Sequence, residues 1–194
     1  MTRRLVPAKP RSNADIESMA LNIVLKYQPS VLSNEESFDI ERFFDCDLEK
    51  ITQVEIDYKP LEAGIYGYTD SENMECVISS DLIDSPHQQN FCRSTMAHES
   101  AHAMMHVHDY RLQKAILKSI HKHDHAIKMY REKDIITYRN PEWQAWRFAG
   151  ALLMPESAIR NAIAKGKKTD DLSEQFGVNP SFVRSRLKVL KVFV

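Results

Sequence analysis

The sequence predicts an α+β fold in which a small β-sheet packs on a central helix and on further helices, with a helix-turn-helix-like segment at the C-terminus. Two patterns favour this fold class. Between residues 52 and 79, apolar residues alternate with polar ones, as in half-buried strands. On both sides of that region apolar residues recur at helical spacing. With 194 residues, 43% of them hydrophobic, the chain is long enough for one core domain and a small appendage.

The elements before residue 90 follow from these patterns. Residues 13–27 form an amphipathic helix, because Ile16, Ala20 and Val24 share one face and Pro29 follows it. A short helix is expected in FDIERFFDC, and TQVEIDY alternates as a half-buried strand does. The stretch GIYGYTDSENMECVISS reads as a hairpin, in which the turn-forming DSEN separates two β-rich runs.

From Asn90 the pattern becomes helical and then strongly charged, up to Pro141. Pro141 is well placed to begin another helix, whose core face carries Ala145, Phe148 and Leu152. Pro155 ends that helix or begins the next one. Residues 165–171 are expected to form a polar linker before a last pair of helices.

Composition narrows the class of protein. Three cysteines without a C-x-x-C pair indicate neither a disulfide framework nor a thiolate zinc site. The N-terminus has no apolar stretch long enough for a signal peptide or membrane span, so a cytoplasmic protein without a membrane partner is expected. Residues 1–107 carry 9 Lys and Arg against 18 Asp and Glu, whereas residues 108–194 carry 17 against 9. This asymmetry marks either solvated helix faces, the favoured reading, or a surface for an oppositely charged partner such as nucleic acid.

The stretch TMAHESAHAMMHVH contains the pattern H-E-x-x-H, formed by His98, Glu99 and His102. On a helix, residues four apart lie on one face, so both imidazoles can converge on a metal ion. Glu99 projects from the neighbouring face, where it can take a proton from water during hydrolysis of a peptide bond. The same pattern also occurs by chance as surface or core histidines. Its apolar surroundings favour a metal site, because they would dry and rigidify it.

Two further histidines in this stretch are weaker ligands. His106 lies eight residues beyond His98, a rise of about 12 Å along a helix, so one ion does not reach both. A packing or supporting role is expected for it. His108 has the spacing of the third metzincin ligand, but Met105 stands where that motif needs a glycine to leave the helix.

A later carboxylate is the other source of a third ligand, as in thermolysin-like sites. Glu132 and Glu142 are the candidates downstream. Glu142 opens an apolar helix that must pack on the core, so it can face inward from a rigid support. Glu132, within YREKD, reads as solvated.

Two other sets of polar side chains have open roles. His121, His123 and His125 surround Asp124, either as a solvated helix end or loop, which is favoured, or as a second metal site. A donor for the developing oxyanion is also needed, and no residue stands out for it. The possible donors are Tyr66, Tyr68, Tyr138 and Arg147.

With these motifs in order, the chain resembles the ImmA/IrrE family of metallopeptidases. The matching segments are GIYGYT, then FCRSTMAHESAHAMMH, then EWQAWRFAGALLMP. The resemblance implies that His98, His102 and Glu142 bind one Zn2+ ion, that Glu99 is the general base, and that residues 1–165 form the zinc metallopeptidase domain. Two departures are Ala101 in place of a glycine and a connection from His108 to Pro141 that looks longer than usual.

The resemblance also implies a function. Similar proteins cleave transcriptional repressors of mobile elements or stress responses, so a zinc-dependent endopeptidase with a helix-turn-helix repressor as its protein substrate is expected. The alternative is a DNA- or protein-binding regulator whose zinc site is structural or inactive. The intact Glu99 favours the enzyme, since a structural site needs no base and usually has a fourth protein ligand.

Residues 166–194 are expected to form the helix-turn-helix-like segment, packed on the peptidase domain. Ser173, Gly177 and Val183 have the spacing of that motif. Leu187 and Leu190 need burial, and this favours a structural or substrate-docking role over contact with DNA. Three basic side chains of the second helix are candidates for phosphate contacts, namely Arg184, Arg186 and Lys188.

Overall fold

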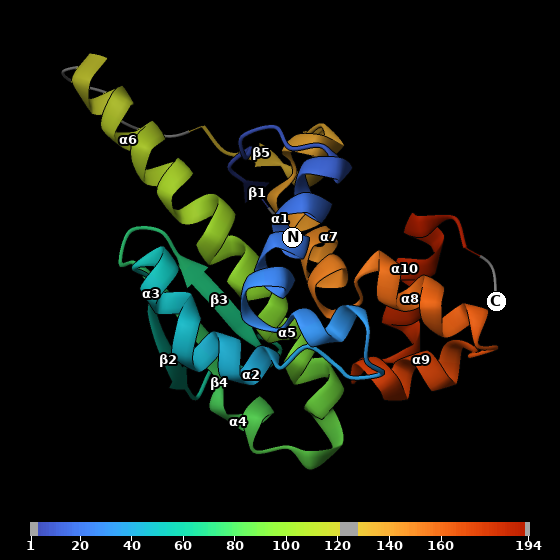
Figure 1. Ribbon diagram of the computed structural model, residues 1–194. Helices are drawn as coiled ribbons and strands as arrows, with labels where there is room; N and C mark the ends of the chain where they lie inside the picture. The colour runs from blue at the N-terminus through green and yellow to red at the C-terminus, as the bar shows by residue number, and fades with distance from the viewer. Residues whose placement is uncertain (1–3, 121–127, 193–194) are drawn as a thin grey trace.

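The computed structural model describes residues 4–120 and 128–192, and it confirms the α+β class. Helix α5 (Gln89–His102) lies between a three-stranded sheet and helix α7 (Pro141–Leu153), as Figure 1 shows. The sheet has the order β2-β4-β3, so β3 (Gly67–Asp70) is an edge strand. Strand β4 (Glu75–Ser79) pairs antiparallel with β3 and parallel with β2 (Glu55–Lys59), which confirms the predicted hairpin and strand.

The remaining elements surround this centre. Strand β1 (Arg4–Leu5) pairs antiparallel with β5 (Tyr130–Arg131), a pairing that the sequence did not predict. The other helices of the described chain are α1 (Asn13–Tyr27), α2 (Ile40–Phe43), α3 (Glu49–Thr52), α4 (Ser80–Ile83), α6 (His108–Ile120), α8 (Glu156–Ala164), α9 (Thr169–Phe176) and α10 (Pro180–Leu190).

Local capping explains where two of the central helices begin. Helix α1 has the predicted bounds, and it starts with a capping box in which Ser12 and Asp15 satisfy each other's backbone N–H groups. Helix α7 starts at Pro141, as predicted, and the Asn140 side chain accepts hydrogen bonds from the next two free backbone N–H groups. The cap places Glu142 in the first turn of a rigid helix.

The helix that contains H-E-x-x-H is longer and less regular than the sequence indicates. After α5 it widens into a π-helical turn, Ala103–Val107, and then continues as α6, which extends away from the body in Figure 1. Arg11 supports the widened turn from the N-terminal segment. Its Nη2 donates to the Met105 carbonyl at 2.9 Å and to the Asp109 carboxylate at 2.7 Å. π-Helical turns within α-helices are frequent at functional sites.

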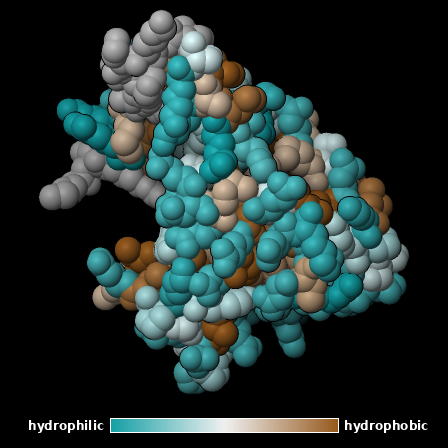
Figure 2. Space-filling model, turned by 90° about the vertical axis from the view of Figure 1, so that its left-hand side faces the viewer, coloured by the Kyte–Doolittle hydropathy of each residue, from teal (hydrophilic) through white to brown (hydrophobic). Residues whose placement is uncertain are grey.

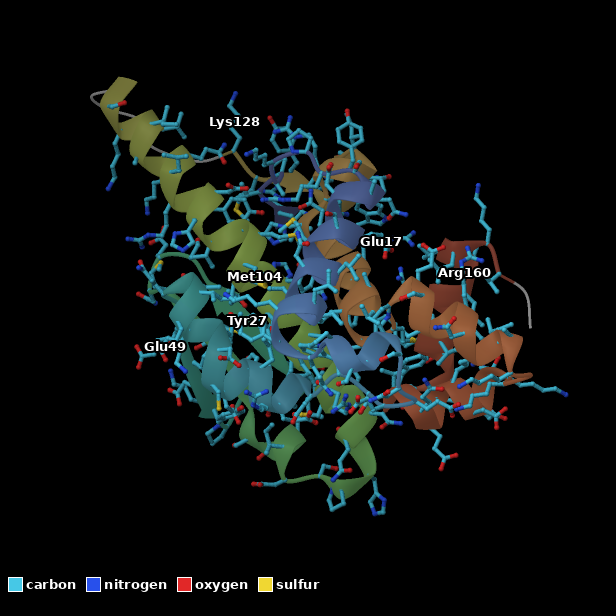
Figure 3. All side chains as sticks on the ribbon, viewed as in Figure 1. Glu17, Tyr27, Glu49, Met104, Lys128 and Arg160 are labelled. Atoms are coloured by element: carbon cyan, nitrogen blue, oxygen red, sulfur yellow. The ribbon has the colours of Figure 1, made fainter. Side chains whose placement is uncertain are left out.

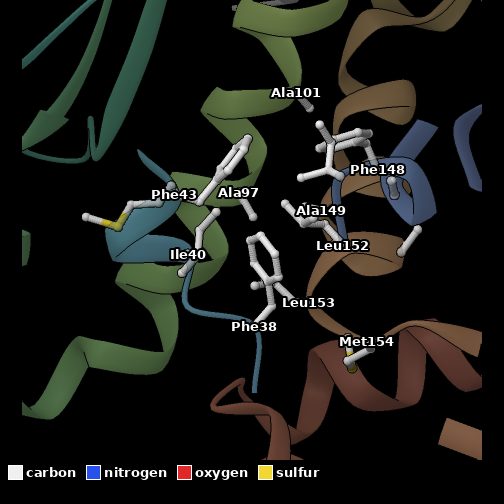
Figure 4. Packing of buried hydrophobic residues seen from close by; sticks show 14 of the residues in the cluster. Phe38, Ile40, Phe43, Ala97, Ala101, Phe148, Ala149, Leu152, Leu153 and Met154 are labelled. Atoms are coloured by element: carbon white, nitrogen blue, oxygen red, sulfur yellow. The ribbon is translucent and has the colours of Figure 1, made fainter. Parts of the chain in front are cut away.

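The main core lies where α5 meets α7. The small side chains Ala97 and Ala101 of α5 are fully buried opposite Phe148 and Ala149 of α7 (Figure 4). Small residues in a helix interface let the two helices approach closely, while Phe148 fills the space beside them. This packing fixes the start of α7 beside the end of α5, and thus Glu142 beside the histidines.

The C-terminal segment contains the predicted pair of helices, α9 and α10, joined by a short turn. Gly177 ends α9 in a left-handed conformation (φ 59°), and Leu187 is buried, as expected. The prediction for Arg186 was wrong. Its side chain is buried, donates to the Met154 carbonyl and holds both carboxylate oxygens of Glu17 on α1, which Figure 3 labels. Arg186 therefore joins α10 to the rest of the fold and does not face a phosphate backbone.

The surface agrees with the sequence composition. Within residues 4–120 and 128–192, no helix has the length and apolar character to cross a membrane. The face shown in Figure 2 is mostly hydrophilic, with hydrophobic residues in small separate groups.

Candidate metal centre

Three side chains that the sequence singled out converge at the junction of α5 and α7. The Nε2 atoms of His98 and His102 are 3.1 Å apart. Glu142 places one carboxylate oxygen 3.4 Å from the His98 Nε2 and the other 3.6 Å from the His102 Nε2. Two ligands of a tetrahedral zinc ion are about 3.3 Å apart when each bond is about 2.0–2.1 Å long. The three side chains thus have the spacing that such an ion requires.

Hydrogen bonds behind the histidines orient the amide of Gln144. This side chain is fully buried, and its Nε2 donates to the backbone carbonyls of Lys9 and Tyr138 at 2.9 and 2.8 Å. Its Oε1 must therefore be the atom that faces the His106 Nε2 at 3.0 Å. An amide oxygen only accepts hydrogen bonds, so the His106 Nε2 carries a proton.

The protonation of His106 sets the tautomer of His102. Burial lowers the pKa of His106 to about 4, so the ring is neutral at pH 7 and its Nδ1 is an acceptor. The His102 Nδ1 lies 2.9 Å from that acceptor and must donate its proton to it. The lone pair of His102 then sits on Nε2, which points toward His98 and Glu142. The hydrogen bonds from Gln144 through His106 thus give His102 the tautomer that a metal ligand needs.

His98 is oriented by packing. Its Nδ1 is buried and has no hydrogen-bond partner among the described residues. The ring of Trp146 lies against the His98 ring, with centroids 4.2 Å apart. Trp146 is one helical turn beyond Glu142 on α7, so the same packing of α7 on α5 positions both residues. The sequence did not assign Trp146 a role, although its i+4 spacing from Glu142 was a usable signal.

Glu99 lies beside this cluster and is held by the edge strand. Its side chain is buried, and one carboxylate oxygen accepts a hydrogen bond from the Thr69 hydroxyl at 2.8 Å. Gly67, two residues earlier on β3, lies so close that an added Cβ would be 3.0 Å from the Glu99 Cγ. Neither Thr69 nor Gly67 was predicted to belong to the site, because strand pairing and packing bring them there from a distant part of the sequence.

The cluster opens into a cleft of about 510 Å³. His98, Glu99 and Glu142 form part of its wall, and Trp146 lies at its side. Strand β3 and the loop before it line another part through residues 64–68. A peptide segment in this cleft can therefore reach His98, Glu99 and Glu142 beside the edge strand β3.

Several candidate residues lie away from the cluster. His108 is exposed, and its Nε2 lies 2.6 Å from the Thr52 carbonyl. Glu132 lies in the short turn Glu132–Asp134, outside the group of converging ligands. The stretch with His121, His123 and His125 lies outside the described residues.

The four candidate oxyanion donors are dispersed. Tyr66 and Tyr68 line the cleft, but the Tyr68 hydroxyl donates to Glu75 at 2.9 Å. Tyr138 is exposed and has no place in the cleft wall. Arg147 lines a different groove, between α7 and α10. Tyr66 is thus the one of the four that lines the cleft without such a competing bond among the described residues.

Comparisons with known proteins bear on the fold and on the family of the chain. A comparison with curated proteins finds no match. The solved structure of a "Mycobacterium tuberculosis transcriptional regulator" is similar in fold, with a TM-score of 0.58 and 16% sequence identity. The match covers 90% of this chain and 47% of that one, so the chain spans about half the length of that protein. The family model Peptidase_M78, described as the IrrE N-terminal-like domain, matches residues 53–188. That segment includes H-E-x-x-H, Glu142 and most of the C-terminal helices, and the chain therefore belongs to this family of zinc metallopeptidases.

Proposed function

We propose that the protein is a zinc-dependent endopeptidase that hydrolyses a peptide bond of a protein substrate. The observation that carries the proposal is the convergence of His98, His102 and Glu142 beside the buried carboxylate of Glu99. The three converging side chains would hold the ion through two imidazole nitrogens and a carboxylate, a donor set that zinc prefers at catalytic sites. When bound, zinc supplies a Lewis acid that polarises the scissile carbonyl and acidifies water.

Glu99 performs the proton transfers in this proposal. Its carboxylate takes a proton from the attacking water and later passes it to the leaving nitrogen of the cleaved bond. The Thr69 hydroxyl fixes the orientation of that carboxylate, while His106 and Gln144 hold the His102 ring through hydrogen bonds. A structural zinc site would need neither a buried base nor a cleft that opens beside it. The geometry thus supports the enzyme over a regulator with an inactive site.

The substrate enters this scheme as an extended segment of polypeptide. Strand β3 is an edge strand whose residues Gly67 and Tyr68 line the cleft, and an added strand can pair with such an edge through backbone hydrogen bonds. We propose a helix-turn-helix repressor of a mobile element or stress response as the substrate, because that is the class implied by the ImmA/IrrE resemblance.

Three variants test this function together. Zinc content and cleavage of a co-encoded repressor are measured for the wild type, Glu99→Gln, Glu142→Ala and His108→Ala. We expect Glu99→Gln to keep zinc and lose cleavage, and Glu142→Ala to lose zinc affinity. Full cleavage by Glu99→Gln would remove the proposed mechanism. Full zinc binding by Glu142→Ala, together with loss of zinc in His108→Ala, would show that the ligand assignment is wrong.

A further inference from the structure

A second groove, of about 510 Å³, lies between α7 and α10, beside the candidate active site. One wall is apolar and largely aromatic, with Trp143 and Trp146 from α7 facing Phe182 and Val189 from α10. The rings of Trp146 and Phe182 pack edge to face, with their centroids 5.7 Å apart. Such a wall suits aromatic and aliphatic side chains of a partner, because it offers them a rigid apolar contact area.

The residues that line the groove include three cations and no carboxylate. Arg147 and Arg186 both line it, and Glu17 bonds to Arg186 through both carboxylate oxygens. The Nη1 of Arg147 is buried and has no hydrogen-bond partner among the described residues. Burial, and then the charge of Arg186, lowers the pKa of Arg147. Lys188 adds a further cation to the rim, so an anionic occupant would complement the groove.

Trp146 connects this groove to the catalytic cleft. It lines both hollows, and its ring also lies against His98. A chain that lies in the cleft along β3 can therefore continue past Trp146 onto α10. This continuity favours polypeptide as the occupant over nucleic acid, as does the largely apolar wall, since nucleic acid binding relies on several unpaired cations.

We propose that the groove between α7 and α10 is an exosite that docks an acidic segment of the protein substrate bearing an aromatic side chain, away from the bond that is cleaved. The inference rests on the proposed peptidase function. The aromatic side chain packs against the apolar wall that Trp143, Phe182 and Val189 line, and a neighbouring carboxylate accepts hydrogen bonds from Arg147. Docking there raises the effective concentration of the scissile segment in the cleft.

The two tryptophans of the chain, Trp143 and Trp146, both line the groove, so tryptophan fluorescence reports on its occupancy. The full-length Glu99→Gln protein is titrated with a short capped peptide of aspartate and glutamate residues around one phenylalanine. The matched peptide carries asparagine and glutamine instead. We expect saturable binding of the acidic peptide and about tenfold weaker binding of the amide peptide, as for loss of a charge-assisted hydrogen bond.

Two variants localise the binding. Arg147→Gln removes the cation, and Ser185→Glu places a carboxylate at an exposed position of the groove, where it repels an acidic peptide without disturbing the core. Both are expected to weaken binding about tenfold. Arg184→Gln, a change of the same charge at an exposed position of α10 outside the groove wall, is expected to bind as the parent does. Equal affinity in the parent and Ser185→Glu would overturn the proposal.

A last comparison separates the exosite from the peptidase function. In an otherwise wild-type protein, Ser185→Glu should raise KM for the folded repressor and leave kcat unchanged. If the protein cleaves the repressor but binds no acidic peptide in the groove, the exosite proposal is wrong and the peptidase function stands. If the protein binds the acidic peptide through Arg147 but cleaves no repressor, the peptidase function is wrong. The groove then remains a binding site for acidic peptides. Tighter, Arg147-dependent binding of single-stranded oligothymidylate would overturn the choice of polypeptide.

Discussion

The Thr69 hydroxyl donates a hydrogen bond to the Glu99 carboxylate over 2.8 Å, so the edge strand β3 fixes the proposed base of the neighbouring helix α5. A carboxylate that accepts a proton in the reaction must hold one orientation toward water and the leaving nitrogen. The contact therefore links the sheet, which is expected to bind substrate, to the group that moves the proton.

Replacing Thr69 with valine tests this link, because valine has nearly the same shape and lacks the hydroxyl. We expect kcat to fall about tenfold, as for the loss of a hydrogen bond to a charged group. Zinc content should not change, since the Thr69 hydroxyl bonds to Cys76 and Glu99, which are not ligands of the proposed ion. Thr69→Ser keeps the hydroxyl and should restore most of the activity. A Thr69→Val enzyme with the wild-type kcat would show that the contact does not position the base.

Gly67 has little room for a side chain. An added Cβ would lie 3.0 Å from the Glu99 Cγ and 3.1 Å from the Val77 carbonyl oxygen, closer than nine in ten real Cβ contacts. Either β3 or Glu99 must shift, so Gly67→Ala is expected to lower kcat while zinc stays bound. It should also lower the free energy of unfolding by about 1–3 kcal/mol, the usual cost of overpacking. Chemical denaturation and zinc analysis of the purified variant measure both quantities.

Gly150 provides the matched control for that substitution. It lies inside α7, where an added Cβ would meet the Arg186 side chain at 3.5 Å, an ordinary van der Waals contact. Alanine has the higher helix propensity, so Gly150→Ala is expected to raise the free energy of unfolding by about 0.5–1 kcal/mol. If both alanine variants lost the same stability, the close approach at Gly67 would not be the cause of its effect.

His106 should matter for zinc binding although it lies outside the converging set. His106→Leu removes the acceptor of the His102 Nδ1 proton and releases the ring from its tautomer. Loss of such a supporting hydrogen bond typically weakens metal affinity about 10–100-fold. Competition with a fluorescent zinc chelator measures the change. His108→Ala serves as the control, because that exposed side chain faces the Thr52 carbonyl and should leave the affinity as it is.

The parts of the site that sequence alone predicted are those that depend on local geometry. His98 and His102 are one helical turn apart, so their common face follows from the spacing of H-E-x-x-H. Glu142 is 40 residues beyond His102, and spacing alone left it as one of two carboxylates until the family resemblance selected it. Thr69 and Gly67 depend on how β3 packs over α5, and no periodicity within either segment indicates that contact.

In the fold, too, the sequence predicted the features that depend on neighbouring residues and missed those that depend on distant contacts. Helices α1 and α7 begin where the apolar periodicity and Pro141 predict, because those signals lie within a few residues of the boundary. The π-helical turn at Ala103–Val107 was not predicted, since the Arg11 side chain that bonds to it comes from the other end of the sequence. Arg186 was assigned to a basic helix face, because its buried partner Glu17 is 169 residues away.

The ion pair between Arg186 and Glu17 yields a further prediction about the C-terminal helices. Arg186 is only 2% exposed, so removing its charge leaves Glu17 facing α10 without a cation and breaks the bond to the Met154 carbonyl. Breaking a buried ion pair typically costs about 3–5 kcal/mol, and the partly exposed Glu17 carboxylate places the expected loss for Arg186→Gln near the lower end, at about 3 kcal/mol.

Thermal and chemical denaturation of Arg186→Gln and Arg184→Gln measure this difference at equal change in charge. Arg184 is exposed on the same helix, so its variant should unfold within about 0.5 kcal/mol of the wild type. If α9 and α10 were an independent DNA-binding unit, both variants would have nearly the wild-type free energy of unfolding. Arg186→Gln would then reduce DNA affinity instead. A large loss confined to Arg186→Gln would show that α10 contributes to the stability of the peptidase fold through α1.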